Sequence, residues 1–178
     1  MSFAIYLAGP GVFRPDALAW GEALKAGCAE YGFTGLFPLD NAVPHGLDAA
    51  AQRQWIFAAN CALIREADLV LADARAFRSA SEPDSGTAFE IGYAHALGKP
   101  VWLWLPDATV GTQMVDRASH GCDHAGRAVD RDGWHVEDFG APLNLMLWQA
   151  AKGVIHAPEP AAALAELAAR LARTDVAY

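Results

Sequence analysis

Two carboxylates lie six residues apart in the segment Asp84-Ser-Gly-Thr-Ala-Phe-Glu90. A short apolar run precedes this segment, and a helical pattern that Gly98 and Pro100 close follows it, so we expect Asp84 in a loop and Glu90 in the first turns of a helix. The positive end of a helix macrodipole favours an ionised carboxylate, which is the form a nucleophile requires. The pattern therefore indicates a catalytic carboxylate at Glu90.

The same residues have a structural alternative. Thr87-x-x-Glu90 fits a capping box, in which Thr87 caps the helix and Glu90 accepts a hydrogen bond from the Thr87 backbone N–H. Short motifs of this kind arise often by chance. This segment alone does not separate a cap from a catalyst, and the other elements of the chain have to decide.

Strand-like and helix-like segments alternate along the chain, which predicts a parallel sheet covered by helices on both faces. The economical fold is an α/β, flavodoxin-like, doubly wound, five-stranded parallel sheet in a single domain spanning residues 1–178. Ligands of such sheets bind at the carboxyl ends of the strands, where Asp84 is expected. The expected strands are 3–8, 33–39, 69–72, 101–105 and 154–156, and the expected helices are 16–30, 49–66, 87–97, 143–152 and 158–173.

A long segment of about residues 106–141 shows little periodicity and is rich in Asp, Gly and His. Loops of this length in compact domains are usually functional or disordered, and we interpret this one as a substrate-covering loop. Its sequence His120-x-Cys122-Asp123-His124 resembles a set of metal ligands, but the spacing matches no standard zinc site. A polar, solvated loop without metal is the favoured interpretation.

The composition and the absence of common motifs limit the classes of partner and the cellular compartment that we expect. A net charge of −8 argues against a nucleic-acid partner, and the absence of Gly-x-x-x-x-Gly-Lys-Ser/Thr and Gly-x-Gly-x-x-Gly argues against a nucleotide cofactor. Three cysteines without Cys-x-x-Cys spacing favour a reduced, cytoplasmic setting. The N-terminus lacks a basic region, and the longest apolar run, residues 101–105, is too short for a membrane span. We therefore expect small-molecule ligands.

Six segments together resemble the nucleoside 2-deoxyribosyltransferase family, in order, from residue 3 to about 155. The late Pro-Leu-Asn-Leu-Met sequence is the most diagnostic. The resemblance implies transfer of 2-deoxyribose between deoxyribonucleosides and free nucleobases by a retaining double displacement, without a cofactor. The segments are Tyr6-Leu-Ala-Gly-Pro, Phe37-Pro-Leu-Asp-Asn41, Ala67-Asp-Leu-Val-Leu-Ala-Asp73, Glu82-Pro-Asp-Ser-Gly-Thr-Ala-Phe-Glu-Ile-Gly-Tyr-Ala94, Gly98-Lys-Pro and Val136-Glu-Asp-Phe-Gly-Ala-Pro-Leu-Asn-Leu-Met146.

The resemblance implies a role for individual residues. Glu90 matches the nucleophile, which Tyr6 orients by a hydrogen bond. Asp84 matches a residue that binds the sugar 5'-hydroxyl, and Asn144 matches one that a neighbouring subunit supplies to the same hydroxyl in a homo-oligomer. The structural alternatives are an aromatic side chain in a buried strand for Tyr6 and a helix cap for Asn144.

Further positions are implied to bind substrate. Gly9 lies in the loop after the first strand, and Val12 and Phe13 in the same loop are implied to line the base pocket. Met146 is implied to pack near Asn144, and ordinary core packing is its alternative. Tyr178 is similar to a C-terminal tyrosine that some members bring to the active site.

The chain departs from the family pattern at the expected proton donor. Counting back eight residues from Asp68 gives Asn60, where better-known members carry an aspartate that contacts the base. An amide forms hydrogen bonds with a base but cannot protonate it. Asp73, at the end of the third strand, is the substitute candidate for the general acid, and an exposed turn aspartate is its alternative.

Two other functions compete with transfer. Related 2'-deoxynucleoside 5'-phosphate N-hydrolases use the same glutamate but carry a serine at the position of Asp84. A carboxylate there repels a phosphate dianion by several kcal/mol at an effective dielectric constant of about 20. A non-catalytic nucleoside-binding domain is the second alternative. The preference for purine or pyrimidine, and the partition between transfer and hydrolysis, stay open.

Overall fold

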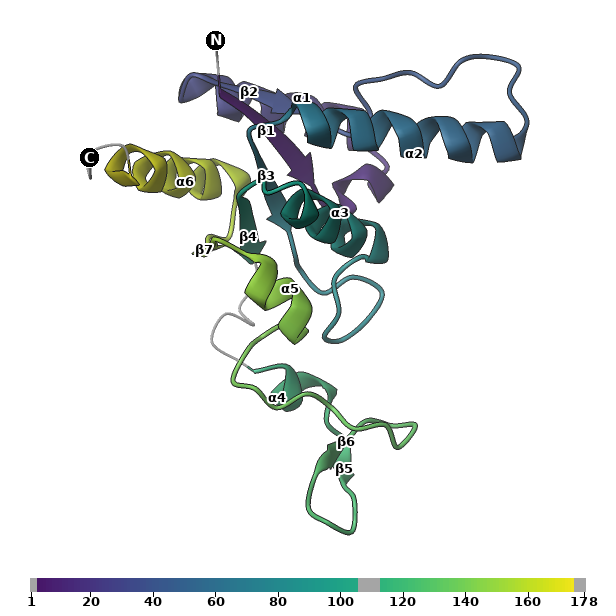
Figure 1. Cartoon of the computed structure of the whole chain (residues 1–178), viewed down its shortest axis with the longest axis vertical. Coiled ribbons are helices and arrows are strands. Elements are labelled where there is room, and N and C mark those ends of the chain that lie inside the picture. Colours follow the sequence, from purple (N-terminus) through teal and green to yellow (C-terminus); the bar gives the residue numbers. More distant parts are fainter. Residues whose placement is uncertain (1–2, 106–112, 175–178) are drawn as a thin grey trace.

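Five parallel strands form the centre of the molecule in the computed structural model, which describes residues 3–105 and 113–174. Their order is β2-β1-β3-β4-β7 (Figure 1). This order confirms the predicted flavodoxin-like, doubly wound sheet of a single α/β domain. The strands are β1 (Phe3–Ala8), β2 (Phe33–Leu36), β3 (Leu69–Asp73), β4 (Val101–Leu105) and β7 (Gly153–His156).

The two faces of the sheet carry separate cores. Side chains alternate between the faces along each strand, so Leu7 and Leu71 pack toward α1 (Ala17–Glu30) and α6 (Pro160–Thr174). Tyr6 and Val70 point the other way. They pack toward the helices α2 (Ala49–Glu66), α3 (Ser85–Ala96) and α5 (Leu145–Ala150).

Most elements lie where the sequence predicts them, and the differences have local causes. The strand β2 ends at Leu36 rather than residue 39, because Asp40 turns the chain back by accepting a hydrogen bond from the Phe37 N–H at 2.7 Å. The helix α3 begins two residues earlier than expected, and α5 begins two residues later. Both helices start directly after a polar side chain that caps them.

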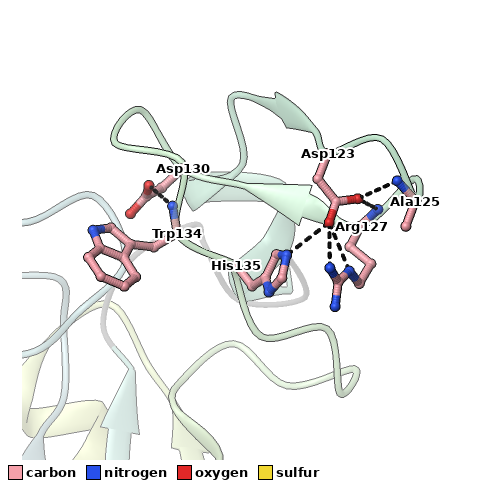
Figure 2. A network of polar contacts seen from close by, with 6 residues as sticks. All are labelled: Asp123, Ala125, Arg127, Asp130, Trp134 and His135. Carbon is pink, nitrogen blue, oxygen red and sulfur yellow. Dashed lines mark hydrogen bonds and ion pairs between the residues drawn. The ribbon is translucent and has the colours of Figure 1, made fainter.

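The described part of the long segment, residues 113–141, forms an arm that projects beyond the sheet (Figure 1). It contains α4 (Met114–Ala118) and a small antiparallel pair, β5 (Gly121–Cys122) and β6 (Ala128–Val129), so it is more regular than the expected loop. Asp123 stabilises the hairpin, since its carboxylate accepts hydrogen bonds from Ala125, Arg127 and His135 (Figure 2). The backbone N–H of Arg127, followed by His135, holds the pKa of Asp123 well below its usual range.

No group of three or more His, Cys, Asp or Glu side chains within residues 3–105 and 113–174 is placed to hold a metal ion. Over the same ranges, no helix combines the length and the apolar character needed to cross a bilayer. His120 accepts a hydrogen bond from Arg131 at 2.8 Å, so the histidine takes part in the polar network of the arm.

Candidate active site

Tyr6 and Glu90 are brought into direct contact from elements that are far apart in the sequence. The Tyr6 hydroxyl donates a hydrogen bond to Glu90 Oε1 at 2.5 Å. Tyr6 is fully buried in β1, and Glu90 is half-buried on α3. The rigid strand therefore fixes one oxygen of a carboxylate near the carboxyl edge of the sheet, where ligands of this fold bind.

The start of α3 depends on Asp84, not on a capping box. Asp84 Oδ2 accepts hydrogen bonds from the Thr87 backbone N–H at 3.0 Å and from the Thr87 hydroxyl at 3.2 Å. Thr87 is consequently the third helical residue, and Glu90, the sixth, turns toward Tyr6. The capping-box interpretation of Thr87 and Glu90 is wrong, because the cap lies one turn earlier in the chain.

The surroundings of Glu90 raise its pKa from 4.5 to about 7. Burial is the main cause, the hydrogen bond from Tyr6 acts in the opposite direction, and the charge of Asp84 adds to the increase. The helix dipole that we expected to favour ionisation of Glu90 therefore does not outweigh the effect of burial on its pKa. Glu90 lies in the second turn, and the effect of the dipole falls off within the first. The Tyr6 pKa is raised above its ordinary value, again chiefly by burial, so its hydroxyl remains a donor.

The helix α2 supplies a polar group to the same face of the sheet. Asn60 has its Oδ1 atom buried and without a hydrogen-bond partner among the described residues. The adjacent Cys61 is buried, and its raised pKa comes first from burial and further from the charge of Glu90. Asn60 therefore belongs to the helix that borders the Tyr6 and Glu90 pair.

Asp73 lies elsewhere. By strand alternation its side chain falls on the α1 and α6 face, opposite Tyr6, and Arg75 binds it through Nε at 2.8 Å and Nη2 at 2.8 Å. Asp73 is only 6% exposed, so the alternative of an exposed turn residue is wrong. The end of β1 packs tightly on it: a Cβ atom on Gly9 would lie 2.7 Å from the Asp73 Cβ. Gly9 thus has a packing reason for lacking a side chain.

The loop after β1 contributes an aromatic surface. Phe13 is 51% exposed and stacks on Phe77, with ring centroids 5.4 Å apart. The Arg78 guanidinium lies over both rings, at 4.9 and 4.7 Å from their centroids. Flat apolar faces of this kind bind nucleobases by stacking.

Asn144 begins α5 and is held from two sides. Its Oδ1 accepts a hydrogen bond from the Met146 N–H at 3.0 Å, which is the geometry of a helix cap, and its Nδ2 donates to Glu137 Oε1 at 2.6 Å. Met146 is 71% exposed, which contradicts core packing within one chain. Tyr178 lies outside the described residues.

The sequence interpretation missed Glu137. No local spacing marks this residue, because its partners at Asn144 and Leu145 become neighbours only when the chain turns back before α5. Among the described residues no hydrogen bond joins Asn144 to Glu90, Tyr6 or Asp84. Within one chain these polar residues therefore form two separate groups, one around Glu90 and one around Asn144.

Comparison with known proteins identifies the family. The family model of nucleoside 2-deoxyribosyltransferase matches residues 5–146. A 2-deoxyribosyltransferase from Leishmania mexicana is 35% identical with a TM-score of 0.68, covering 94% of this chain and 97% of that one. An uncharacterized protein of Schizosaccharomyces pombe is 36% identical over 80% of this chain and 74% of its own length.

A CMP N-glycosidase from Clostridium botulinum is 17% identical with a TM-score of 0.51, covering 94% of this chain and 98% of that one. At that identity the likeness concerns the fold alone. The chain belongs to the nucleoside 2-deoxyribosyltransferase family.

Proposed function

We propose that this chain transfers 2-deoxyribose from one nucleobase to another through a covalent deoxyribosyl intermediate on Glu90. The contact between Tyr6 and Glu90 carries the proposal, because it holds one carboxylate oxygen in place at 2.5 Å while the second oxygen stays available for attack. Membership of the family supports the same chemistry.

In the first step Glu90 Oε2 attacks C1' of the nucleoside. A C–O bond forms, the C1'–N bond breaks, and the departing base takes the bonding electrons and a proton. The transition state carries positive charge on the sugar, which a nearby carboxylate stabilises. Tyr6 keeps Glu90 from rotating, so the attack begins from a fixed geometry.

In the second step a nitrogen of the incoming base attacks C1'. The bond to Glu90 breaks, the carboxylate is restored, and the new base releases a proton. We place the base against Phe13, whose exposed ring offers a stacking surface. A base stacked there excludes water, and this exclusion favours transfer over hydrolysis.

Asp84 is our candidate for the sugar 5'-hydroxyl. Its described hydrogen bonds to Thr87 use Oδ2, which leaves Oδ1 as an acceptor. A 5'-phosphate would instead meet a carboxylate, so monophosphates are disfavoured. We expect Asp84→Ser to increase the ratio of monophosphate cleavage to nucleoside cleavage. Wild-type preference for deoxynucleoside monophosphates would favour the N-hydrolase instead.

Asn60 is our candidate for a hydrogen bond to the base edge, since its buried Oδ1 has no described partner. It cannot protonate the leaving base. Asp73 is separated from Glu90 by the sheet and paired with Arg75, and a carboxylate in such a pair is a poor proton donor. We propose that the proton comes from solvent.

We further propose a homo-oligomer in which Asn144 of one subunit completes the site of another, with the arm of residues 113–141 lying over the substrate. Exposed apolar side chains on α2, α3 and α5 support a subunit contact, among them Phe57, Phe89 and Met146. Mixing inactive Glu90→Ala subunits with weakly active Asn144→Ala subunits should raise activity above that of either variant alone as subunits exchange. A fully active monomer in sedimentation at the assay concentration would exclude the shared site.

The decisive experiment incubates the protein with deoxyinosine, with and without adenine. A transferase forms deoxyadenosine and hypoxanthine only when adenine is present. Release of free deoxyribose at the same rate in both reactions would identify a hydrolase. Binding of deoxyinosine without any turnover would identify the non-catalytic domain, and either result would refute the proposal.

A further inference from the structure

The Glu137 carboxylate holds the start of α5 with both of its oxygens. Oε1 accepts the hydrogen bond from Asn144 Nδ2 at 2.6 Å, and Oε2 accepts one from the Leu145 backbone N–H at 2.8 Å. Glu137 and Asn144 are both half-buried. A carboxylate that accepts two such bonds restrains an amide side chain strongly, since charge-assisted hydrogen bonds are roughly twice as strong as neutral ones.

This arrangement decides which way the Asn144 amide points. The Met146 N–H is a donor and requires Asn144 Oδ1, whereas Glu137 in its ionised form only accepts and requires Nδ2. A flipped amide would place Nδ2 against the Met146 N–H, which are both donors, and Oδ1 against the Glu137 carboxylate, which are both acceptors. Two independent contacts therefore select one orientation, which leaves the second N–H of Asn144 Nδ2 for a ligand.

A second contact from the arm fixes the backbone beside Asn144. Arg117, on α4, donates through Nη2 to the Pro142 carbonyl, two residues before Asn144. Its Nη1 donates to the Ala80 carbonyl at 3.4 Å, in the loop that leads to Asp84. The arm thus contacts both segments that carry the candidate 5'-hydroxyl ligands.

We infer that Glu137 is a positioning residue that presents Asn144 as a hydrogen-bond donor to the sugar 5'-hydroxyl. The inference rests on the proposed function. The hydroxyl has one hydrogen, which Asp84 Oδ1 of the neighbouring subunit accepts, and its oxygen accepts the free N–H of Asn144. With the two side chains in these complementary roles, the site distinguishes a 5'-hydroxyl from a 5'-hydrogen.

The substitution Glu137→Gln tests this role with minimal change in shape. The glutamine Nε2 is a donor, so it competes with the Asn144 amide or forces it to flip. We expect kcat/KM for deoxyinosine to fall about 10- to 100-fold, the range of a lost hydrogen bond to a charged group. With 2',5'-dideoxyinosine, which lacks the 5'-hydroxyl, wild type and Glu137→Gln should react equally. Asp138→Asn removes the same charge from the adjacent exposed residue and should change neither rate.

A double-mutant cycle separates positioning from a purely structural role. In an Asn144→Ala background, Glu137→Gln should cause no further loss. An equal loss with both substrates, or additive losses in the cycle, would overturn the inference. Thermal unfolding of each variant reports folding separately. Failure of the proposed function itself would appear differently, as absence of base exchange in the wild type.

Discussion

The two faces of the sheet give a carboxylate different partners. On the α2 and α3 face, Glu90 meets a tyrosine hydroxyl, and burial raises its pKa to about 7. On the α1 and α6 face, Asp73 is more deeply buried but is paired with Arg75, whose guanidinium also lies 5.6 Å from the Trp104 ring centroid. Burial alone therefore does not make a carboxylate reactive, because the partner decides whether its charge remains available.

Glu90→Gln tests the reactive face most strongly. The amide keeps the shape of the side chain but cannot form the covalent intermediate, so we expect kcat to fall by at least about 10³. Mass spectrometry of wild type with a slow 2-fluoro substrate analogue should show a glycosyl adduct that the variant lacks. A variant with near wild-type turnover would remove Glu90 from the chemistry.

Tyr6→Phe removes the orienting hydroxyl. We expect a loss of about 10- to 100-fold in kcat/KM, the worth of one hydrogen bond to a charged group. The hydrogen bond from Tyr6 lowers the pKa of Glu90, so its loss should also move the acidic limb of the pH profile upward. If kcat/KM and the acidic limb of the pH profile both stay unchanged, Tyr6 contributes only to core packing.

The pH dependence of wild type should follow the ionisation of Glu90. If the Glu90 carboxylate is the nucleophile, as we propose, its pKa of about 7 makes kcat/KM fall about tenfold per pH unit well below pH 7. Asp84→Asn should move this limb to lower pH, because the Asp84 charge raises the Glu90 pKa. A limb that stays in place in this variant would contradict the coupling between the two carboxylates.

The stability of the fold should respond to the same group. The folded protein holds the Glu90 proton up to a pKa of about 7, whereas the unfolded chain releases it near 4.5. The free energy of unfolding is therefore unaffected by this group below about pH 4.5 and decreases as pH rises from there through 7. Glu90→Gln should therefore become more stable than wild type at pH 8, by up to about 3 kcal/mol, with a smaller difference at pH 4. Urea unfolding at both pH values measures this, and a pH-independent difference would refute it.

Asp73→Asn should have the smallest effect on activity. The substitution removes the counter-charge of Arg75 and lowers stability. We expect kcat/KM to change less than about tenfold, because Asp73 is not the general acid in our proposal, and loss of a general acid typically costs a factor of about 10²–10⁴. Arg75→Gln is the matched variant, since it breaks the same pair from the other side. A loss above a hundredfold in Asp73→Asn alone would make Asp73 a direct participant.

The sequence by itself determined the order along the chain of the five sheet strands and of the helices that cover them. Alternating apolar runs and helical patterns are local, so β4 and α2 begin and end where the spacing predicts. The local sequence pattern also predicted that Asp84 and Glu90 lie near the start of the helix that follows the third strand. The residue that caps this helix is Asp84 and not Thr87. Motifs in order were sufficient for the family resemblance, which the match over residues 5–146 confirms.

Only the tertiary structure decided which of these residues meet. The bond from Tyr6 to Glu90 joins positions 84 residues apart, and the face on which Asp73 falls depends on the register of the whole sheet. The pKa of Glu90 also depends on the tertiary structure, because the elements that bury its carboxyl are distant from it in the sequence. Glu137 shows the same limit: its role is invisible until the chain turns back to place both carboxylate oxygens against the start of α5.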